Sequence, residues 1–89
     1  MNKALGFFEV RSLVAAMNAA DVMVKAADVV IKDFNVVGSG VVAVIIEGEV
    51  AAVQAAIACA EQEAKGMAEV IGINVIPRPE EGMEMLFNA

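Results

Sequence analysis

The feature that most limits the possible folds is a Gly-Ser-Gly triplet, at residues 38–40, between two β-branched runs. Residues 29–37 are VVIKDFNVV and residues 41–49 are VVAVIIEGE. Such runs are typical of strands, and a short glycine-containing connection joins antiparallel neighbours. Glycine also supplies the positive φ angles that a tight turn needs. The sequence therefore predicts a β-hairpin with its turn at the triplet.

The segment that precedes the hairpin has the pattern of a strand followed by an amphipathic helix. Residues 3–11, KALGFFEVR, are apolar with two Phe and predict a strand. Ser12 is a residue type that caps helix N-termini. The helix is expected to bury one apolar stripe with spacings of four and three. Its members are Leu13, Met17, Ala20, Val24 and Ala27.

A second helix and a fourth strand are predicted after the hairpin. Glu49 lies at the start of this helix, where a carboxylate interacts favourably with the helix dipole, and Gly66 predicts its end. Residues 68–76, AEVIGINVI, predict the strand, which the two prolines at 77–79 end. The stripe that this helix is expected to bury consists of Val50, Val53, Ile57, Ala60 and Ala64.

The predicted order of elements is β-α-β-β-α-β. This order is typical of an α+β, ferredoxin-like fold, in which an antiparallel sheet carries both helices on one face. Residues 80–89 are expected to form a short C-terminal helix or to lie over the surface. The other face of the sheet and both edge strands would be left uncovered, which favours protein partners.

The composition also favours an oligomer. Of the 89 residues, 60% are apolar, and most of these are Ala and Val. A domain of this length removes only about 60–65% of its unfolded surface from water, and large exposed apolar patches usually mark contact surfaces. The longest charge-free stretch, residues 34–46, is too short for a spanning helix of ~20 residues. The first ten residues do not resemble a signal peptide, and no membrane partner is expected.

The sequence offers little catalytic or metal-binding chemistry. It has no His, which removes the usual general base and the commonest metal ligand. Its single cysteine, Cys59, suits a reducing cytosol and is expected to be a small buried apolar side chain. With a net charge of −6 and no basic stripe, the chain is not expected to bind nucleic acid. We therefore expect no enzyme activity, cofactor or metal.

Three motifs in this order resemble the single-domain, hexamer-forming shell proteins of bacterial microcompartments, which carry the BMC domain. They are Ala-Ala-Asp-x-Met-x-Lys-Ala-Ala at 19–27, the Gly-Ser-Gly at 38–40 followed by an apolar strand, and Ile-Pro-Arg-Pro at 76–79. The resemblance implies that residues 1–89 form one BMC domain, with a core at 4–79 and a variable tail at 80–89.

The resemblance also implies a structural function. In this family, six subunits close into a ring with a central pore, and rings tile edge to edge into the facets of a cytoplasmic protein shell around enzymes. The implied partners are further copies of the chain, other shell proteins, targeting helices of encapsulated enzymes, and small polar metabolites in transit. The implied pore-lining residues are Gly38, Ser39 and Gly40, and the implied hexamer-edge residues are Lys25 and Arg78.

Three positions depart from the usual pattern of this family. Val36 lies where several relatives have a lysine near the opening, so a strong preference of the opening for anions is less expected here. Ser12 replaces a glycine and can cap a helix. Asn74 replaces a histidine that is common in the final strand.

Two other classes of function are alternatives to a shell protein. The first is a regulatory module of the same ferredoxin-like fold that holds a small molecule between its subunits. The second is an enzyme subunit that uses Cys59, which the absence of a histidine partner disfavours. On its own, the triplet at 38–40 fits a structural turn, and a functional role requires many copies of it in one place.

Overall fold

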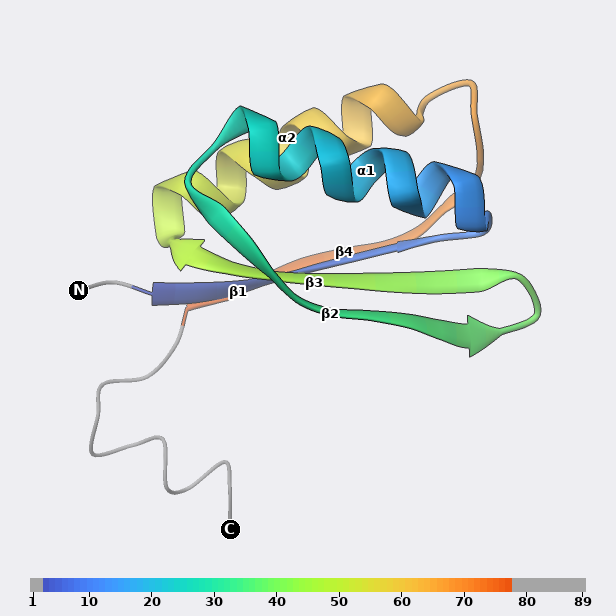
Figure 1. Cartoon of the computed structure of the whole chain (residues 1–89), viewed down its shortest axis with the longest axis horizontal. Helices are drawn as coiled ribbons and strands as arrows, with labels where there is room; N and C mark the ends of the chain where they lie inside the picture. Colours follow the sequence, from blue (N-terminus) through green and yellow to red (C-terminus); the bar gives the residue numbers. More distant parts are fainter. Residues whose placement is uncertain (1–2, 78–89) are drawn as a thin grey trace, which may run out of the picture.

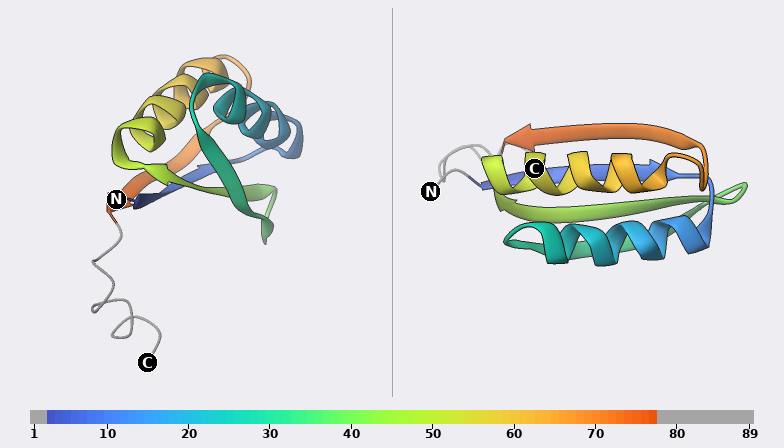
Figure 2. Two further views of the ribbon diagram at one scale, coloured as in Figure 1. Left: turned by 60° about the vertical axis from the view of Figure 1, so that its left-hand side comes forward. Right: turned by 90° about the horizontal axis from the view of Figure 1, so that it is seen from above.

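The computed structural model describes residues 3–77 and confirms the predicted α+β architecture. The strands are β1 (Lys3–Val10), β2 (Val29–Gly38), β3 (Val41–Glu49) and β4 (Val70–Pro77), and the helices are α1 (Leu13–Ala26) and α2 (Val50–Ala64). Both helices lie on the same face of the sheet (Figure 1). Seen from above, they run side by side along the strands (Figure 2).

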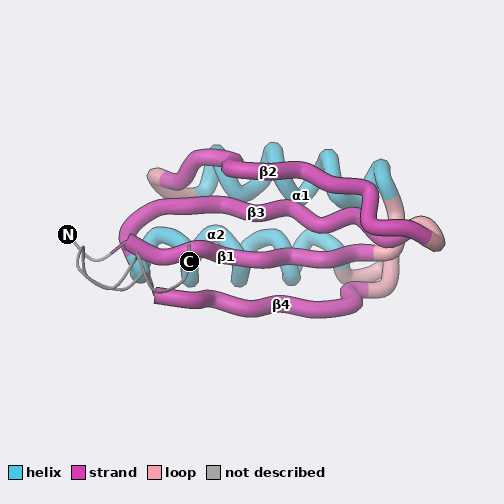
Figure 3. The backbone as a smooth tube through the Cα atoms, turned by 90° about the horizontal axis from the view of Figure 1, so that it is seen from below, coloured by secondary structure: helices cyan, strands magenta, loops and turns pink. Residues whose placement is uncertain are grey.

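The sheet has the strand order β2-β3-β1-β4, with β2 and β4 at its edges (Figure 3). Every neighbouring pair is antiparallel. The central strand β1 runs from Lys3, opposite Glu49 of β3, to Val10, opposite Val42 of β3. This is the ferredoxin-like plan, which leaves one face of the sheet and both edges without cover from the helices.

The core lies between the sheet and the two helices. Strands β1 and β3 alternate between fully buried and half-buried residues, so each has one face on the core. The β3 sequence does not reveal this, because Val41, Ala43 and Ile45 on its other face are apolar too. The largest fully buried side chains are those of Phe8, Met23, Ile46, Val10, Val42, Val44 and Val53.

The stripe that the sequence predicts for α1 is wrong for its larger members, although Ala20 and Ala27 pack against the core. Leu13 and Met17 are 52% and 59% exposed, whereas the helix buries Ala15, Ala16, Ala19 and Met23. The helix has apolar residues around most of its circumference, so the spacing alone does not identify the inward face. The small alanine side chains let α1 approach its neighbours closely. Met23 is the one large side chain that the helix buries fully, whereas Leu13, Val14, Met17 and Val24 are exposed.

The buried face of helix α2 agrees better with the face predicted from the sequence. It buries Val53, Ile57, Ala60 and Ala64 as predicted, together with Ala56, and Val50 packs against the core. Gly66 follows the helix with φ +84°, in the left-handed region that favours glycine. The prediction of a buried Cys59 is wrong, because this residue of α2 is exposed.

A large apolar surface remains outside this core. It is spread over α1, the edge strands β2 and β4, and the segment after α2. Its larger members, each more than a third exposed, are Leu13, Val14, Met17, Val24, Val30, Ile31, Val36, Val37, Met67, Ile71, Ile73 and Ile76. An isolated subunit would present this surface to water, and surfaces of this kind usually mark protein contacts.

Candidate functional site

The 38–40 turn joins β2 to β3 and has an unusual backbone. All three of its residues have positive φ angles, +139° for Gly38, +53° for Ser39 and +78° for Gly40. Two of these positions suit glycine, but a serine in the left-handed region is uncommon. Positive φ angles at both central residues are usual for a tight hairpin turn, and contacts from outside the turn would give the serine conformation further support.

Arg11 gives that support from the end of β1. Its side-chain N–H donates to the carbonyl oxygen of Ser39 at 3.0 Å, and its Nε lies 3.2 Å from Oε1 of Glu69. The backbone N–H of Arg11 also donates to the carbonyl of Glu69 at 2.9 Å. A Cβ added at Gly40 would lie 3.8 Å from the Arg11 Cγ, so the aliphatic stem lies against the turn. This contact is not predictable from the sequence, because 28 residues separate the two partners and no motif marks Arg11.

The hairpin that carries the turn extends past the helices. In Figure 1 the β2–β3 end projects beyond the N-terminal end of α1. Val36 and Val37, just before the turn, are 68% and 60% exposed. No atom lies within 4 Å of where a Cβ on Gly38 would be, so this side of the turn is open. The turn is thus free to meet other copies of the chain.

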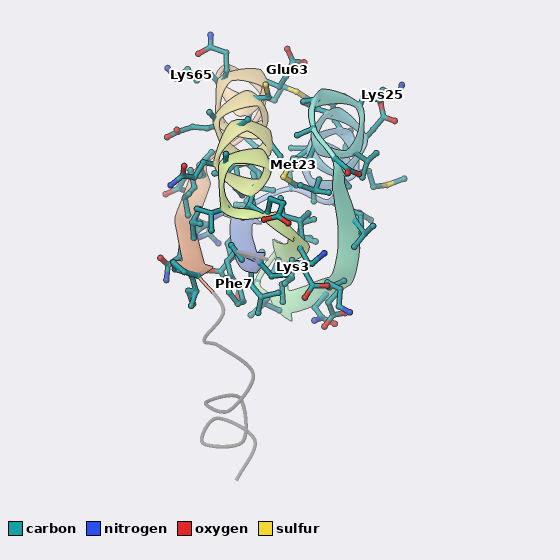
Figure 4. All side chains as sticks on the ribbon, turned by 90° about the vertical axis from the view of Figure 1, so that its left-hand side faces the viewer. Lys3, Phe7, Met23, Lys25, Glu63 and Lys65 are labelled. Atoms are coloured by element: carbon teal, nitrogen blue, oxygen red, sulfur yellow. The ribbon has the colours of Figure 1, made fainter. Side chains whose placement is uncertain are left out.

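Lys25 lies at the opposite end of α1 from Arg11. Its Nζ is 3.0 Å from Oδ2 of Asp21, one helical turn earlier, and its side chain is 74% exposed. Viewed end on, Lys25 projects from the outer side of α1, and Lys65 projects from the other side of the helical layer (Figure 4). An open groove beside Lys25 runs between the two helices, and it is lined by Asp21, Val22, Lys25, Ala26, Ala58, Cys59, Gln62 and Glu63.

The remaining predicted site residue, Arg78, lies outside the described residues, and so does the predicted C-terminal helix at 80–89. The structure brings Gly38, Ser39 and Gly40 together in one turn. It does not bring Lys25 near them. Within residues 3–77, no group of three His, Cys, Asp or Glu side chains could hold a metal ion. Over the same range, no helix has the length and apolarity to cross a membrane.

Comparison with known proteins gives a consistent family. The model of the BMC domain matches residues 4–79. The chain is 43% identical to the bacterial microcompartment shell protein PduA of Citrobacter freundii, over 94% of this chain and 90% of the relative. It is 39% identical to the shell protein EutM of Escherichia coli, over 96% of this chain and 88% of the relative. It is 42% identical to the carboxysome shell protein CcmK2 of Thermosynechococcus vestitus, over 91% and 81% of the two chains.

A solved structure supports the same assignment. A microcompartment protein from Desulfitobacterium hafniense superposes with a TM-score of 0.82 and 31% identity, over 91% of this chain. This chain spans 44% of the length of that protein. The family match, the relatives and the shared fold agree, and the chain belongs to the BMC domain family of microcompartment and carboxysome shell proteins.

Proposed function

We propose that this protein is a structural tile of a bacterial microcompartment shell, which forms cyclic hexamers that pack edge to edge into facets. The observation that carries the proposal is the large apolar surface on α1, β2 and β4, outside a core that is already complete. Burial of this surface against further copies would stabilise an assembly by roughly 25 cal/mol for each Å² of apolar area. In this assignment residues 1–89 form one domain, with its core at 4–79 and a variable tail at 80–89.

A ring gives the 38–40 turn its function. A head-to-tail contact that closes by rotation repeats each feature of the subunit around one axis. We place the turn at that axis, so that Gly38, Ser39 and Gly40 of each subunit line a central pore. The projection of the hairpin beyond the helices supports this place (Figure 1). The open space beside Gly38 supports it too, since a larger side chain there would point into the opening.

The chemistry of the turn suits small polar solutes. A ring of six Ser39 hydroxyls and the backbone groups of the glycines would form a polar, water-filled constriction. Pores select by their diameter and by the donors and acceptors that line them, so apolar solutes would be disfavoured. The proposed role of the protein at this opening is passage of small polar metabolites, without catalysis and without a cofactor.

We assign Lys25 and Arg78 to the hexamer edge. Lys25 is exposed at the end of α1 on the outer side of the helical layer, which suits a contact with a neighbouring ring. Arg78 lies between Pro77 and Pro79 in the sequence. The two prolines restrict the backbone there, so a planar group with five donors would be aimed at little cost in entropy.

The further partners follow from the shell. They are other shell proteins in the same facet and targeting helices of encapsulated enzymes on one face. The proposed location is the shell of a cytoplasmic microcompartment. No nucleic acid and no membrane is proposed as a partner.

Native mass spectrometry and electron microscopy of the purified protein test this function. We expect a mass of six subunits at low protein concentration and flat sheets or tubes of rings at high concentration. A dimer or trimer that binds one small molecule stoichiometrically and never tiles would contradict the proposal, and would favour the regulatory module instead.

A further inference from the structure

We infer that Arg11 is the positioning residue of the 38–40 turn, and that it sets which solutes the opening favours. The first part rests on the contacts of this subunit alone. The second part also rests on the proposed place of the turn at a central pore.

The contacts of Arg11 tie three separate strand ends together. Arg11 directly follows β1, its head reaches the turn between β2 and β3, and its Nε faces Glu69, directly before β4. The planar guanidinium donates to the Ser39 carbonyl and to the Glu69 carboxylate at the same time, because its N–H groups point in fixed directions. Its stem lies against Gly40. The turn is thus held at its carbonyl and at its glycine from one side.

This contact decides which polar groups of Ser39 remain free. The carbonyl oxygen is already occupied by the Arg11 N–H. The Ser39 hydroxyl makes no hydrogen bond with any residue in the part of the chain that the structure describes. A carbonyl turned into a pore would attract cations, whereas a carbonyl capped by a guanidinium does not. Arg11 therefore leaves the hydroxyl of Ser39, and not its carbonyl oxygen, available to solutes.

Arg11 also brings a positive charge to the turn. Position 36, two residues before the turn, holds valine, so the hairpin itself has no cation there. Glu69 offsets part of the Arg11 charge, but its side chain is 68% exposed and its charge is screened by water. Six guanidiniums around one opening would favour small anions over neutral solutes of the same size.

Three variants separate the effect of Arg11 on the position of the turn from the effect of its charge. Arg11→Met keeps the stem and removes the donors and the charge, Arg11→Lys keeps the charge without the planar fork, and Glu69→Gln removes the opposing charge. Lys65→Met is the matched control, because Lys65 is exposed on the far side of the helical layer (Figure 4). Native mass spectrometry confirms the ring for each variant before it is compared.

Crystal structures of these variants test the positioning. We expect the Ser39 carbonyl to rotate away, or the turn to take more than one conformation, in Arg11→Met and in Arg11→Lys. Lys65→Met and Glu69→Gln should leave the turn unchanged. An unchanged Ser39 φ angle and carbonyl direction in Arg11→Met would overturn the inference.

Permeability of reconstituted shells tests the second part, with glycolate and ethylene glycol as an anionic and a neutral solute of similar size. Arg11→Met should lower the glycolate-to-ethylene-glycol ratio by about threefold or more, because it removes one screened charge from each of the six subunits around the opening. Glu69→Gln should raise the ratio, and Lys65→Met should not change it. An equal ratio in Arg11→Met and the original protein would overturn the claim on selectivity. If the original shells admitted neither solute, the proposed pore would fail, while the crystal structures would still decide whether Arg11 holds the turn.

Discussion

Gly6 is a position at which a single added methyl group would disturb the core. An added Cβ would lie 2.7 Å from Cγ1 of Val53 and 3.0 Å from Cγ1 of Ile46. Both neighbours are fully buried, so neither can move into solvent. The absence of a side chain at Gly6 lets α2 pack directly against β1 and sets the spacing of the two layers.

Gly6→Ala is therefore expected to lower the free energy of unfolding by about 1–3 kcal/mol, the usual cost of overpacking a core. Gly72→Ala is the matched control, because its Cβ would meet only the end of the Glu9 side chain, at 3.2 Å. Urea unfolding at a fixed subunit concentration measures both. Equal stability of the two variants would show that the layer spacing does not depend on Gly6.

Ser39 combines a strained backbone with a proposed place at the pore. Its φ of +53° disfavours any residue with a Cβ, and Ser39→Gly is expected to relieve about 1 kcal/mol while the ring stays intact. Ser39→Leu is expected to narrow the opening and to exclude water from it, while the hexamer still forms. Uptake of ethylene glycol by reconstituted shells should fall severalfold for Ser39→Leu and not for Ser39→Gly. Unchanged uptake for Ser39→Leu would remove Ser39 from the pore.

At the scale of elements, helix α1 shows where sequence reasoning succeeds and where it fails. The start of the helix is predicted correctly, since the Ser12 Oγ accepts from the backbone N–H of Ala15 at 3.0 Å. The inward face is not, because polar residues on α1 are few and two apolar stripes compete. Packing against α2 and the sheet buries the alanine stripe. The spacing of apolar residues in the sequence does not predict which of the two stripes is buried.

The hairpin, too, is only partly predictable from the sequence. The strands and the turn at 38–40 follow from the two β-branched runs and the glycines. The contact of Arg11 with Ser39 does not, because it forms only when the end of β1 and the β2–β3 turn meet at one end of the sheet. The exposure of Cys59 likewise depends on how α2 is rotated about its axis. Hydrophobic periodicity predicts this rotation only when one face of a helix is apolar and the opposite face is polar.

The cap of α1 gives a prediction at this scale. Ser12→Ala should lower the free energy of unfolding by about 1 kcal/mol, because the Ala15 amide loses its partner. Ser12→Gly should lower the free energy of unfolding by only roughly a few tenths of a kcal/mol, because glycine is also suited to the N-cap position. Thermal unfolding followed by circular dichroism compares the two. Unchanged stability of Ser12→Ala would show that the hydroxyl does not act as the cap.

At the scale of the whole molecule, the exposed apolar side chains of β2 and β4 lie at opposite edges of the sheet, and those of α1 add a further exposed surface. One contact between two copies would cover only part of this surface. A ring offers two different contacts to each subunit, and tiling of rings adds a third. This distribution supports a repeated assembly better than a simple dimer.

Lys25→Ala is expected to leave the hexamer intact and to prevent the growth of sheets. The Asp21–Lys25 pair is exposed, so its loss should change the stability of the subunit by only about 0.5 kcal/mol. Lys65→Ala, on the other side of the helical layer, is the control. Native mass spectrometry and electron microscopy distinguish rings from sheets. Loss of the hexamer itself in Lys25→Ala would show that this lysine lies inside the ring and not at its edge.

The central claim is that copies of the chain close around an axis at the 38–40 turn. A cryo-electron microscopy map of the assembled protein tests it directly, because the position of each turn relative to the symmetry axis is visible at moderate resolution. We expect a six-fold ring with Ser39 of every subunit at the narrowest point of a central opening. A map in which residues 38–40 lie on the outer rim, or in which no rotational symmetry relates the subunits, would contradict the account.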